Sequence, residues 1–220
     1  MSVIVRRPII CVLTRARGRT GSPEREALLA RLEAAASAGA TMIQVRERQL
    51  DDRQLITFVR EIAVRVRPAG ALVTMNDRID IALAAGADGV HLKSDGPPAD
   101  DVRRIVPREF LIGRSVHGED EAADVAASGA CDYLMFGTVF PSRSKPPDHP
   151  VAGVETLARV CGRVAAPVVA IGGMSVDRAA AVASAGAAGI AAISLFADAA
   201  DVESIVGALR DALTLPPRHV

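Results

Sequence analysis

The chain has 220 residues, of which 50% are apolar and 24% are charged. This length and composition exclude a disordered or fibrous protein and predict one globular domain with a full core. Basic and acidic residues balance at 26 each, so no overall positive field exists to hold nucleic acid or an anionic membrane. Any anion that the protein binds must therefore be met by local groups.

Cysteine usage and apolar runs indicate where the protein works. Cys11, Cys131 and Cys161 are far apart and form no CxxC pair, which argues against a disulfide framework or a structural zinc site. No apolar run reaches the ~20 residues of a membrane span, and Arg6-Arg7-Pro8 interrupts the apolar start before a signal-peptide core forms. We therefore expect a cytoplasmic protein that binds neither membrane nor nucleic acid.

Short apolar runs bounded by turn residues predict eight β-strands, with helical patterns between them. The strands are expected at Ile9–Leu13, Met42–Arg46, Leu72–Asn76, Gly89–Leu92, Leu111–Ser115, Tyr133–Phe136, Val168–Ile171 and Gly189–Ile193. The helices are expected at Pro23–Ala38, Gln54–Val66, Glu119–Ala127, Val154–Val164, Val176–Ser184 and Val202–Leu213. Because strands and helices alternate, the strands should be parallel.

A short phrase recurs at the junction between a helix and the next strand. It reads Ala-Gly-Ala at 38–40, 85–87 and 185–187 and Ser-Gly-Ala at 128–130. Glycine ends a helix cheaply because it adopts the left-handed conformation just past the last turn. Eight strands that alternate with helices, with no GxGxxG after the first strand, predict an α/β protein with a single-domain TIM (β/α)8 barrel. This domain would span 1–220, with an ordered core over about 9–213 and a tail at 214–220.

Polar side chains follow the second predicted strand. Gln44 and Arg46 alternate with Ile43 and Val45, so they share the face that points into the barrel mouth. Such groups are costly to bury unless an anionic ligand or a partner meets them. They therefore predict an anion site, and the alternative is a salt-bridged strand end.

The ends of the third and fifth strands add a candidate metal ligand and a candidate acid or base. Asn76 and Asp77 offer an amide and a carboxylate that could hold Mg²⁺, although the pair is also an ordinary N-cap for the next helix. Ser115 and His117 share one face of the fifth strand, which makes His117 a candidate general acid or base. The alternative is a solvated loop histidine.

Two further features predict phosphate sites. The long loop 141–150 carries Ser142, Arg143, Ser144 and Lys145, whose hydroxyls and cations suit phosphate or pyrophosphate, unless the loop is simply solvated. Gly172-Gly173 and Ser194 follow the seventh and eighth strands, where TIM barrels commonly bind phosphate, unless the glycines serve packing alone. Two anion sites at one mouth predict an enzyme that joins a pyrophosphate-bearing molecule to a phosphate-bearing one.

The order of these motifs, from Ile9 to Ala197, resembles the thiamine phosphate synthase/TenI superfamily. The motifs that carry the resemblance are Gln44-Val45-Arg46-Glu47-Arg48, Asn76-Asp77, Asp88-Gly89-Val90-His91-Leu92, Gly113-Arg114-Ser115-Val116-His117, Asp132-Tyr133, the run from Phe136 to Lys145, and Ile171-Gly172-Gly173.

The synthase branch of this family would couple hydroxymethylpyrimidine pyrophosphate to thiazole phosphate carboxylate and release pyrophosphate with Mg²⁺. The resemblance implies a catalytic set of Arg46, Ser115, His117 and Lys145. It implies a substrate-binding set of Gln44, Arg48, Asn76, Ser142, Ser144, Gly172, Gly173 and Ser194, and metal ligands Asp77 and Asp95. Arg46, Lys145 and Asn76 would meet the pyrophosphate, Ser115 and Gln44 the pyrimidine, and Gly173 with Ser194 the thiazole phosphate.

The chain departs from the synthase pattern at three places. Arg48 stands where the pattern has Lys, Ser142 and Ser144 stand where it has Thr, and Gly96 stands where it has a second Mg²⁺ carboxylate, with Asp95 one position earlier. The sister branch, the thiazole tautomerases, works without metal and would use His117 as its base. A third reading is a non-catalytic barrel that binds thiazole or thiamine phosphates. Whether the chain forms a homo-oligomer is left open.

Overall fold

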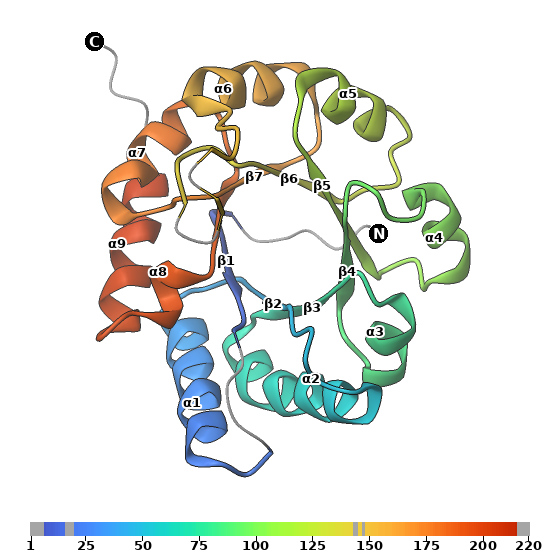
Figure 1. Ribbon diagram of the computed structural model, residues 1–220, viewed down its shortest axis with the longest axis vertical. Helices are drawn as coiled ribbons and strands as arrows, with labels where there is room; N and C mark the ends of the chain where they lie inside the picture. The colour runs from blue at the N-terminus through green and yellow to red at the C-terminus, as the bar shows by residue number, and fades with distance from the viewer. Residues whose placement is uncertain (1–6, 16–19, 143–144, 147, 215–220) are drawn as a thin grey trace.

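A computed structural model of the protein describes residues 7–15, 20–142, 145–146 and 148–214. Its eight strands are all parallel and follow one another in chain order around a closed barrel, in which β8 pairs with β1. Figure 1 shows the strands as an inner ring and the helices around it. The predicted TIM barrel is therefore confirmed.

The elements have the following bounds. The strands are β1 Ile9–Leu13, β2 Met42–Val45, β3 Leu72–Asn76, β4 Gly89–Leu92, β5 Leu111–Val116, β6 Tyr133–Phe136, β7 Val168–Ile171 and β8 Gly189–Ala192. The helices are α1 Pro23–Ser37, α2 Asp52–Val66, η1 Arg67–Ala69, α3 Ile79–Ala85, α4 Ala99–Ile105, α5 Glu119–Ala127, α6 Gly153–Arg163, α7 Val176–Ser184, α8 Ser194–Ala197 and α9 Val202–Thr214.

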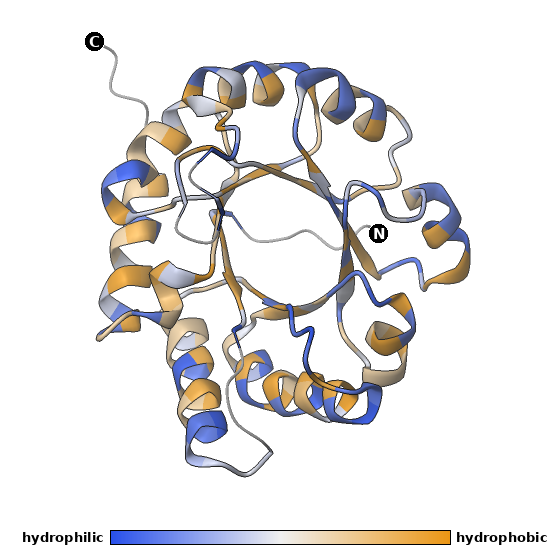
Figure 2. Cartoon of the chain, viewed as in Figure 1, coloured by the Kyte–Doolittle hydropathy of each residue, from blue (hydrophilic) through white to orange (hydrophobic). Residues whose placement is uncertain are grey.

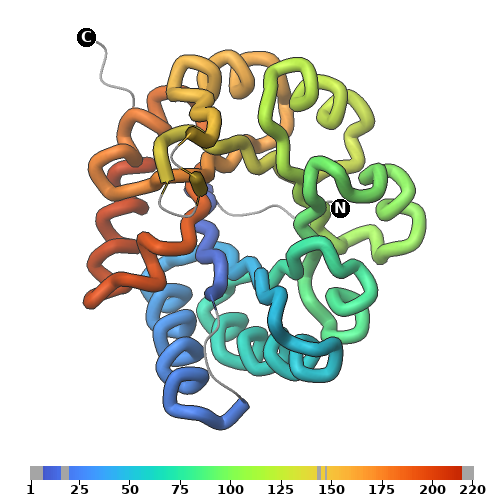
Figure 3. Tube along the Cα trace, viewed as in Figure 1, coloured from blue at the N-terminus to red at the C-terminus, as the bar shows by residue number. Residues whose placement is uncertain are grey.

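All eight predicted strands occur, and each lies within one residue of its predicted ends. The sequence prediction gave no bounds for α3, α4 and α8, which have seven, seven and four residues and are too short for a clear helical repeat. Of the predicted tail 214–220, Thr214 ends α9 and the other residues lie outside the described part of the chain. Figure 3 shows how each strand and helix pair lies beside the next around the ring.

The barrel wall separates two apolar layers, because alternate strand residues face opposite sides. Ile10 and Val12 of β1 face outward and pack in the large core beneath the helices. Figure 2 shows strands that are hydrophobic along most of their length, with helices that carry both kinds of residue. The inner layer contains Ile9, Cys11, Leu13, Met42, Leu111, Tyr133, Met135, Val169 and Ala191.

The only tyrosine of the chain, Tyr133, lies fully buried inside the barrel. Its ring passes so close to β5 that an ideal Cβ on Gly113 would lie 2.1 Å from the ring. Glycine at this position is therefore what allows one large aromatic ring to fill the barrel interior. Among the described helices, none combines the length and the apolar character that crossing a membrane requires.

Candidate active site

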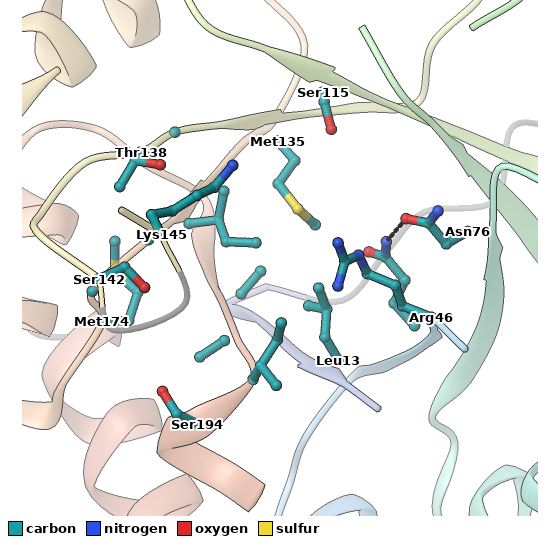
Figure 4. A pocket seen from close by; sticks show the side chains of 18 of the residues that line it. Leu13, Arg46, Asn76, Ser115, Met135, Thr138, Ser142, Lys145, Met174 and Ser194 are labelled. Carbon is teal, nitrogen blue, oxygen red and sulfur yellow. Dashed lines mark hydrogen bonds between the residues drawn. The ribbon is translucent and has the colours of Figure 1, made fainter. Parts of the chain in front are cut away.

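A cavity of about 440 Å³ opens where the carboxyl ends of the strands meet. Figure 4 shows side chains from several strands and loops turned toward it, with Arg46 and Asn76 on one side and Ser142 and Lys145 on the other. Predicted site residues that line it are Gln44, Arg46, Arg48, Asn76, Ser115, His117, Ser142, Lys145, Gly172, Gly173 and Ser194. Of the other predicted residues, Ser144 lies outside the described part of the chain, and Asp77 and Asp95 are not part of the lining.

A buried threonine at the end of β1 holds the second strand end in place. Thr14 is 2% exposed, and its backbone N–H donates to Gln44 O at 3.0 Å. Its hydroxyl accepts from the backbone N–H of Arg46 at 3.0 Å and donates to Glu47 Oε1 at 2.6 Å. These bonds fix the end of β2. Gln44 and Arg46 lie on the face predicted from their alternation.

Gln44 carries an acceptor that is unpaired within the described part of the chain. Its Nε2 donates to Asn76 Oδ1 at 3.0 Å, the bond drawn in Figure 4. Gln44 is 1% exposed, and its Oε1 is buried with no hydrogen-bond partner among the residues that the structure describes. An unpaired buried carbonyl costs roughly 1–3 kcal/mol. The side chain is therefore suited to accept an N–H from a ligand in the cavity.

The cation at the end of β2 is half-buried and has a second cation close by. Burial lowers the pKa of the Arg46 guanidinium, and the positive charge of Arg48 lowers this pKa further, while Glu47 opposes both. Two adjacent positive charges repel each other until an anion lies between or beside them. Arg46 and Arg48 therefore form a site that favours a multiply charged anion.

The glycine turn after β7 packs tightly against the long β6–α6 loop. Gly172 and Gly173 have φ values of +100° and +61°, in the left-handed region that favours glycine. The backbone N–H groups of Val139 and Phe140 donate to Ile171 O and Gly172 O, at 3.0 and 3.2 Å. The two loops therefore form one continuous wall of the cavity.

Arg178 of α7 reinforces this wall, although the sequence did not suggest it. Its Nη1 donates to Gly173 O, and its guanidinium carbon lies 4.6 Å from the centre of the Phe140 ring. One side chain thus contacts both loops. The role of Arg178 depends on the Phe140 ring, which belongs to a distant loop, and on the carbonyl of Gly173. No sequence motif could have indicated this pairing.

His91 is a lining residue that the sequence prediction missed. It is 2% exposed, with Nδ1 3.2 Å from Tyr133 Oη and Nε2 2.9 Å from Ser115 Oγ. Burial lowers the pKa of His91 to about 4, an effect that Asp77 opposes and Arg114 supports. The imidazole is therefore neutral at physiological pH and orients the Ser115 hydroxyl. The strand alternation that predicted Gln44 also places His91 on the inner face of β4.

The low pKa of His91 makes stability depend on pH. Between pH 6.5 and 4, this histidine is protonated in the unfolded chain but stays neutral in the folded protein. Its contribution to the free energy of unfolding is therefore fully present above pH 6.5 and is lost as the pH falls toward 4. We expect this group to lower the free energy of unfolding by about 2 kcal/mol between pH 7 and pH 5. Urea unfolding at several pH values measures the slope. The His91→Gln variant should show a shallower slope, and an equal slope would contradict this assignment.

His117 also lines the cavity, and one of its ring nitrogens is already engaged. Nδ1 lies 2.5 Å from Gly137 O, and a carbonyl oxygen can only accept, so Nδ1 carries the proton. With the proton on Nδ1, Nε2 is the ring nitrogen that can accept one. The backbone N–H of His117 donates to Glu121 Oε2 at 2.7 Å, which anchors the end of β5 to α5. The ring of His117 is thus held in a defined orientation by Gly137 O.

The predicted metal ligands Asp77 and Asp95 lie in different surroundings. Asp77 is ion-paired with Lys93, and Asp95 is exposed. Among the described residues, no group of three or more His, Cys, Asp or Glu side chains is arranged to hold a metal ion. The alternative reading of Asn76-Asp77 as a helix cap is wrong, because the N-cap of α3 is Arg78 and no described side chain caps that helix.

Comparison with known proteins agrees with this arrangement. The thiamine-phosphate synthase of Methanoculleus marisnigri is 43% identical over 195 residues, which cover 89% of each chain. The thiamine-phosphate synthase of Moorella thermoacetica is 41% identical over 180 residues, which cover 82% of this chain and 85% of that protein. Two named enzymes are therefore similar in sequence to this chain over more than four fifths of its length.

Solved structures and a family profile extend the comparison. The thiamine phosphate pyrophosphorylase of Pyrococcus furiosus has a TM-score of 0.79 at 35% identity and covers 93% of this chain and 95% of its own. A 3-hexulose-6-phosphate synthase, at a TM-score of 0.68 and 18% identity, covers 94% of this chain and all of its own, and shares the fold alone. The profile described as thiamine monophosphate synthase matches residues 16–196. On this match and these identities, the chain belongs to the thiamine monophosphate synthase family.

Proposed function

We propose that this protein is a thiamine-phosphate synthase that couples hydroxymethylpyrimidine pyrophosphate to thiazole phosphate and releases pyrophosphate. The observation that carries the proposal is one cavity with two kinds of anion-binding group. Arg46, Arg48 and Lys145 supply positive charge, while Gly172 and Gly173 supply a backbone turn. The synthase branch predicted from the sequence is confirmed by the names and identities of the relatives.

The contacts of the cavity support a role for each side. Arg46 and Lys145 would bind the pyrophosphate, with Arg48 and Asn76 beside it. The unpaired Gln44 Oε1 would accept an N–H from the aminopyrimidine. Ser115 would also contact the pyrimidine, Ser142 would lie at the thiazole, and Gly173 with Ser194 would bind the thiazole phosphate.

The reaction makes few demands on the protein beyond placement and charge. The bond between the pyrimidine methylene carbon and the pyrophosphate oxygen breaks, and the electron pair leaves with pyrophosphate. The thiazole nitrogen then forms a bond to the same carbon. Fixed cations stabilise the charge that builds on the leaving group, and a shared cavity holds the two substrates close together. Ser115, oriented by neutral His91, would position the pyrimidine.

A role for magnesium is implied only by the resemblance to the family, which predicts Asp77 and Asp95 of this chain as its ligands. The described residues do not fit a site of that kind, since Lys93 pairs with Asp77 and residue 96 is glycine. We therefore derive no step through a metal ion. The cytoplasmic location stays a prediction.

One assay tests the proposed function. Purified protein is mixed with the pyrimidine pyrophosphate, thiazole phosphate and Mg²⁺, and thiamine phosphate is measured by chromatography. We expect product together with one pyrophosphate per turnover. An authentic synthase in the same mixture is the control. If the control forms product and this protein does not, the proposal is wrong.

A second candidate function is thiazole tautomerisation, and the His117 geometry favours it. Because Nδ1 carries the proton, Nε2 can take a proton from a bound thiazole carboxylate phosphate. In that case His117→Asn should stop isomerisation and leave product binding almost unchanged. An isomerase signal that survives this substitution would exclude His117 as the base. If neither reaction occurs while the phosphates bind, the protein is the non-catalytic barrel.

A further inference from the structure

Lys93 supplies a cation at the barrel mouth that none of the roles above uses. It directly follows β4, and its Nζ forms an ion pair with Asp77 Oδ2, directly after β3. Lys93 is 46% exposed and Asp77 is 23% exposed. The residue before Asp77 is Asn76, which lines the cavity. The ion pair therefore lies at the rim, beside the side of the cavity where we place the diphosphate.

The rarity of lysine in this chain makes its placement informative. Of 26 basic residues, Lys93 and Lys145 are the only lysines, and all the others are arginines. Both lysines follow strand ends, and Lys145 lines the cavity. Lysine presents a compact charge that phosphate oxygens can approach from many directions. The chain thus has lysine only in two of the loops that follow the carboxyl ends of the strands.

The backbone holds the Asp77 carboxylate at the rim in an unusual conformation. Asp77 has a φ of +69°, the only positive φ of a non-glycine residue among those the structure describes. Its backbone N–H donates to His91 O at 2.9 Å. The left-handed conformation is disfavoured for an L-residue, and such residues concentrate at functional sites. The position of this carboxylate is therefore determined by the barrel wall.

Gly96 lies beside this carboxylate without contributing one of its own. An ideal Cβ on Gly96 would lie 3.5 Å from Asp77 Oδ1. The loop is fixed there, because the guanidinium of Arg114 donates to three carbonyl oxygens of residues 94–97, one of them that of Gly96. A carboxylate at position 96 would face Asp77 across a small gap. In this chain, the ammonium of Lys93 meets Asp77 instead.

We propose that Lys93 replaces a second metal-binding carboxylate with a built-in cation. Its ammonium neutralises Asp77, so the β3–β4 side of the cavity carries no uncompensated negative charge. Without Lys93, the bare carboxylate of Asp77 would repel a diphosphate and would need a metal ion between them. With it, the protein binds diphosphate with little help from Mg²⁺. This inference rests on the proposed function, because it requires a diphosphate in the cavity.

The first test measures the binding of inorganic pyrophosphate by isothermal titration calorimetry, in EDTA and in Mg²⁺. In EDTA, Lys93→Ala should weaken binding about tenfold, and Mg²⁺ should restore most of the loss because Asp77 is then free to bind it. For each protein, the Kd in EDTA is divided by the Kd in Mg²⁺. Comparing these ratios between proteins removes the effect of Mg²⁺ on pyrophosphate itself. Arg104→Ala, which removes an exposed cation from α4, is the matched control and should keep the wild-type ratio.

A double variant separates neutralisation of Asp77 from a general loss of charge. Adding Asp77→Asn to Lys93→Ala removes the repulsion, so binding in EDTA should recover in part and Mg²⁺ should no longer improve it. If Lys93→Ala keeps the wild-type ratio while pyrophosphate binds, the inference is wrong and the proposed function stands. If the wild-type protein binds pyrophosphate in neither buffer, the proposed diphosphate site is wrong and the inference falls with it.

The second test measures metal binding to the protein without substrate. Mn²⁺ binding, followed by electron paramagnetic resonance, should be about tenfold tighter in Lys93→Ala/Gly96→Asp than in the wild type. Gly96 has no positive φ, so a side chain there needs only a small shift of its neighbours. Lys93→Ala/Gly96→Asn has the same shape without the charge and should not show this gain. Equal Mn²⁺ affinity in the wild type and the Asp variant would overturn the inference.

Discussion

Replacing Gly173 with alanine is expected to abolish binding of thiazole phosphate and to lower the free energy of unfolding by roughly 2–4 kcal/mol. The φ of +61° already disfavours an L-residue. A Cβ there would lie 2.4 Å from Pro141 O and 2.8 Å from Phe140 O. Both are backbone atoms, so relief requires the long loop to move away from the glycine turn. Calorimetric titration and urea unfolding measure the two effects.

The matched control for this substitution is Gly162→Ala in α6. Gly162 lies inside a helix, and a Cβ there would meet nothing within 4 Å. Alanine is the better helix former, so we expect unchanged binding and a gain of up to ~1 kcal/mol in stability. If Gly173→Ala binds thiazole phosphate as tightly as the wild type, the glycine turn is not the phosphate site.

Lys145→Ala should raise the KM for the pyrimidine pyrophosphate by about ten- to a hundredfold and leave the KM for thiazole phosphate within about threefold. Figure 4 shows the Lys145 side chain extended into the cavity from the β6–α6 loop. Its backbone N–H donates to Ser142 O at 3.0 Å, so the lysine and the serine lie on one turn. A charge-assisted contact with the diphosphate is lost in the variant, while the glycine turn is unchanged.

Steady-state kinetics with each substrate varied in turn measures this difference. Lys145→Arg keeps the charge and should recover much of the loss, which separates charge from shape. Arg104→Ala again tests whether any loss of a cation has the same effect. Equal increases of both KM values in Lys145→Ala would show that this lysine does not distinguish the two substrates.

The strand-end residues show how far sequence patterns reach. Alternation placed Gln44 and Arg46 on one face, and both line the cavity. The same rule applied to β4 would have placed His91 on the inner face. His91 is buried in the structure. Asp77 shows the limit of such patterns. Its partner Lys93 belongs to another strand end, and the left-handed backbone that directs its carboxylate leaves no mark in the residue order.

By itself, the sequence determined the repeated strand and helix units, the barrel and the family, because each of these follows from local periodicity and ordered motifs. Only the tertiary structure decided which strand-end groups pair with one another. The contact of His91 with Tyr133 joins residues 42 apart, and the contact of Gln44 with Asn76 joins residues 32 apart. The physical reason is that closing the barrel sets these distances, and side chains at the same rim then compete for the same partners.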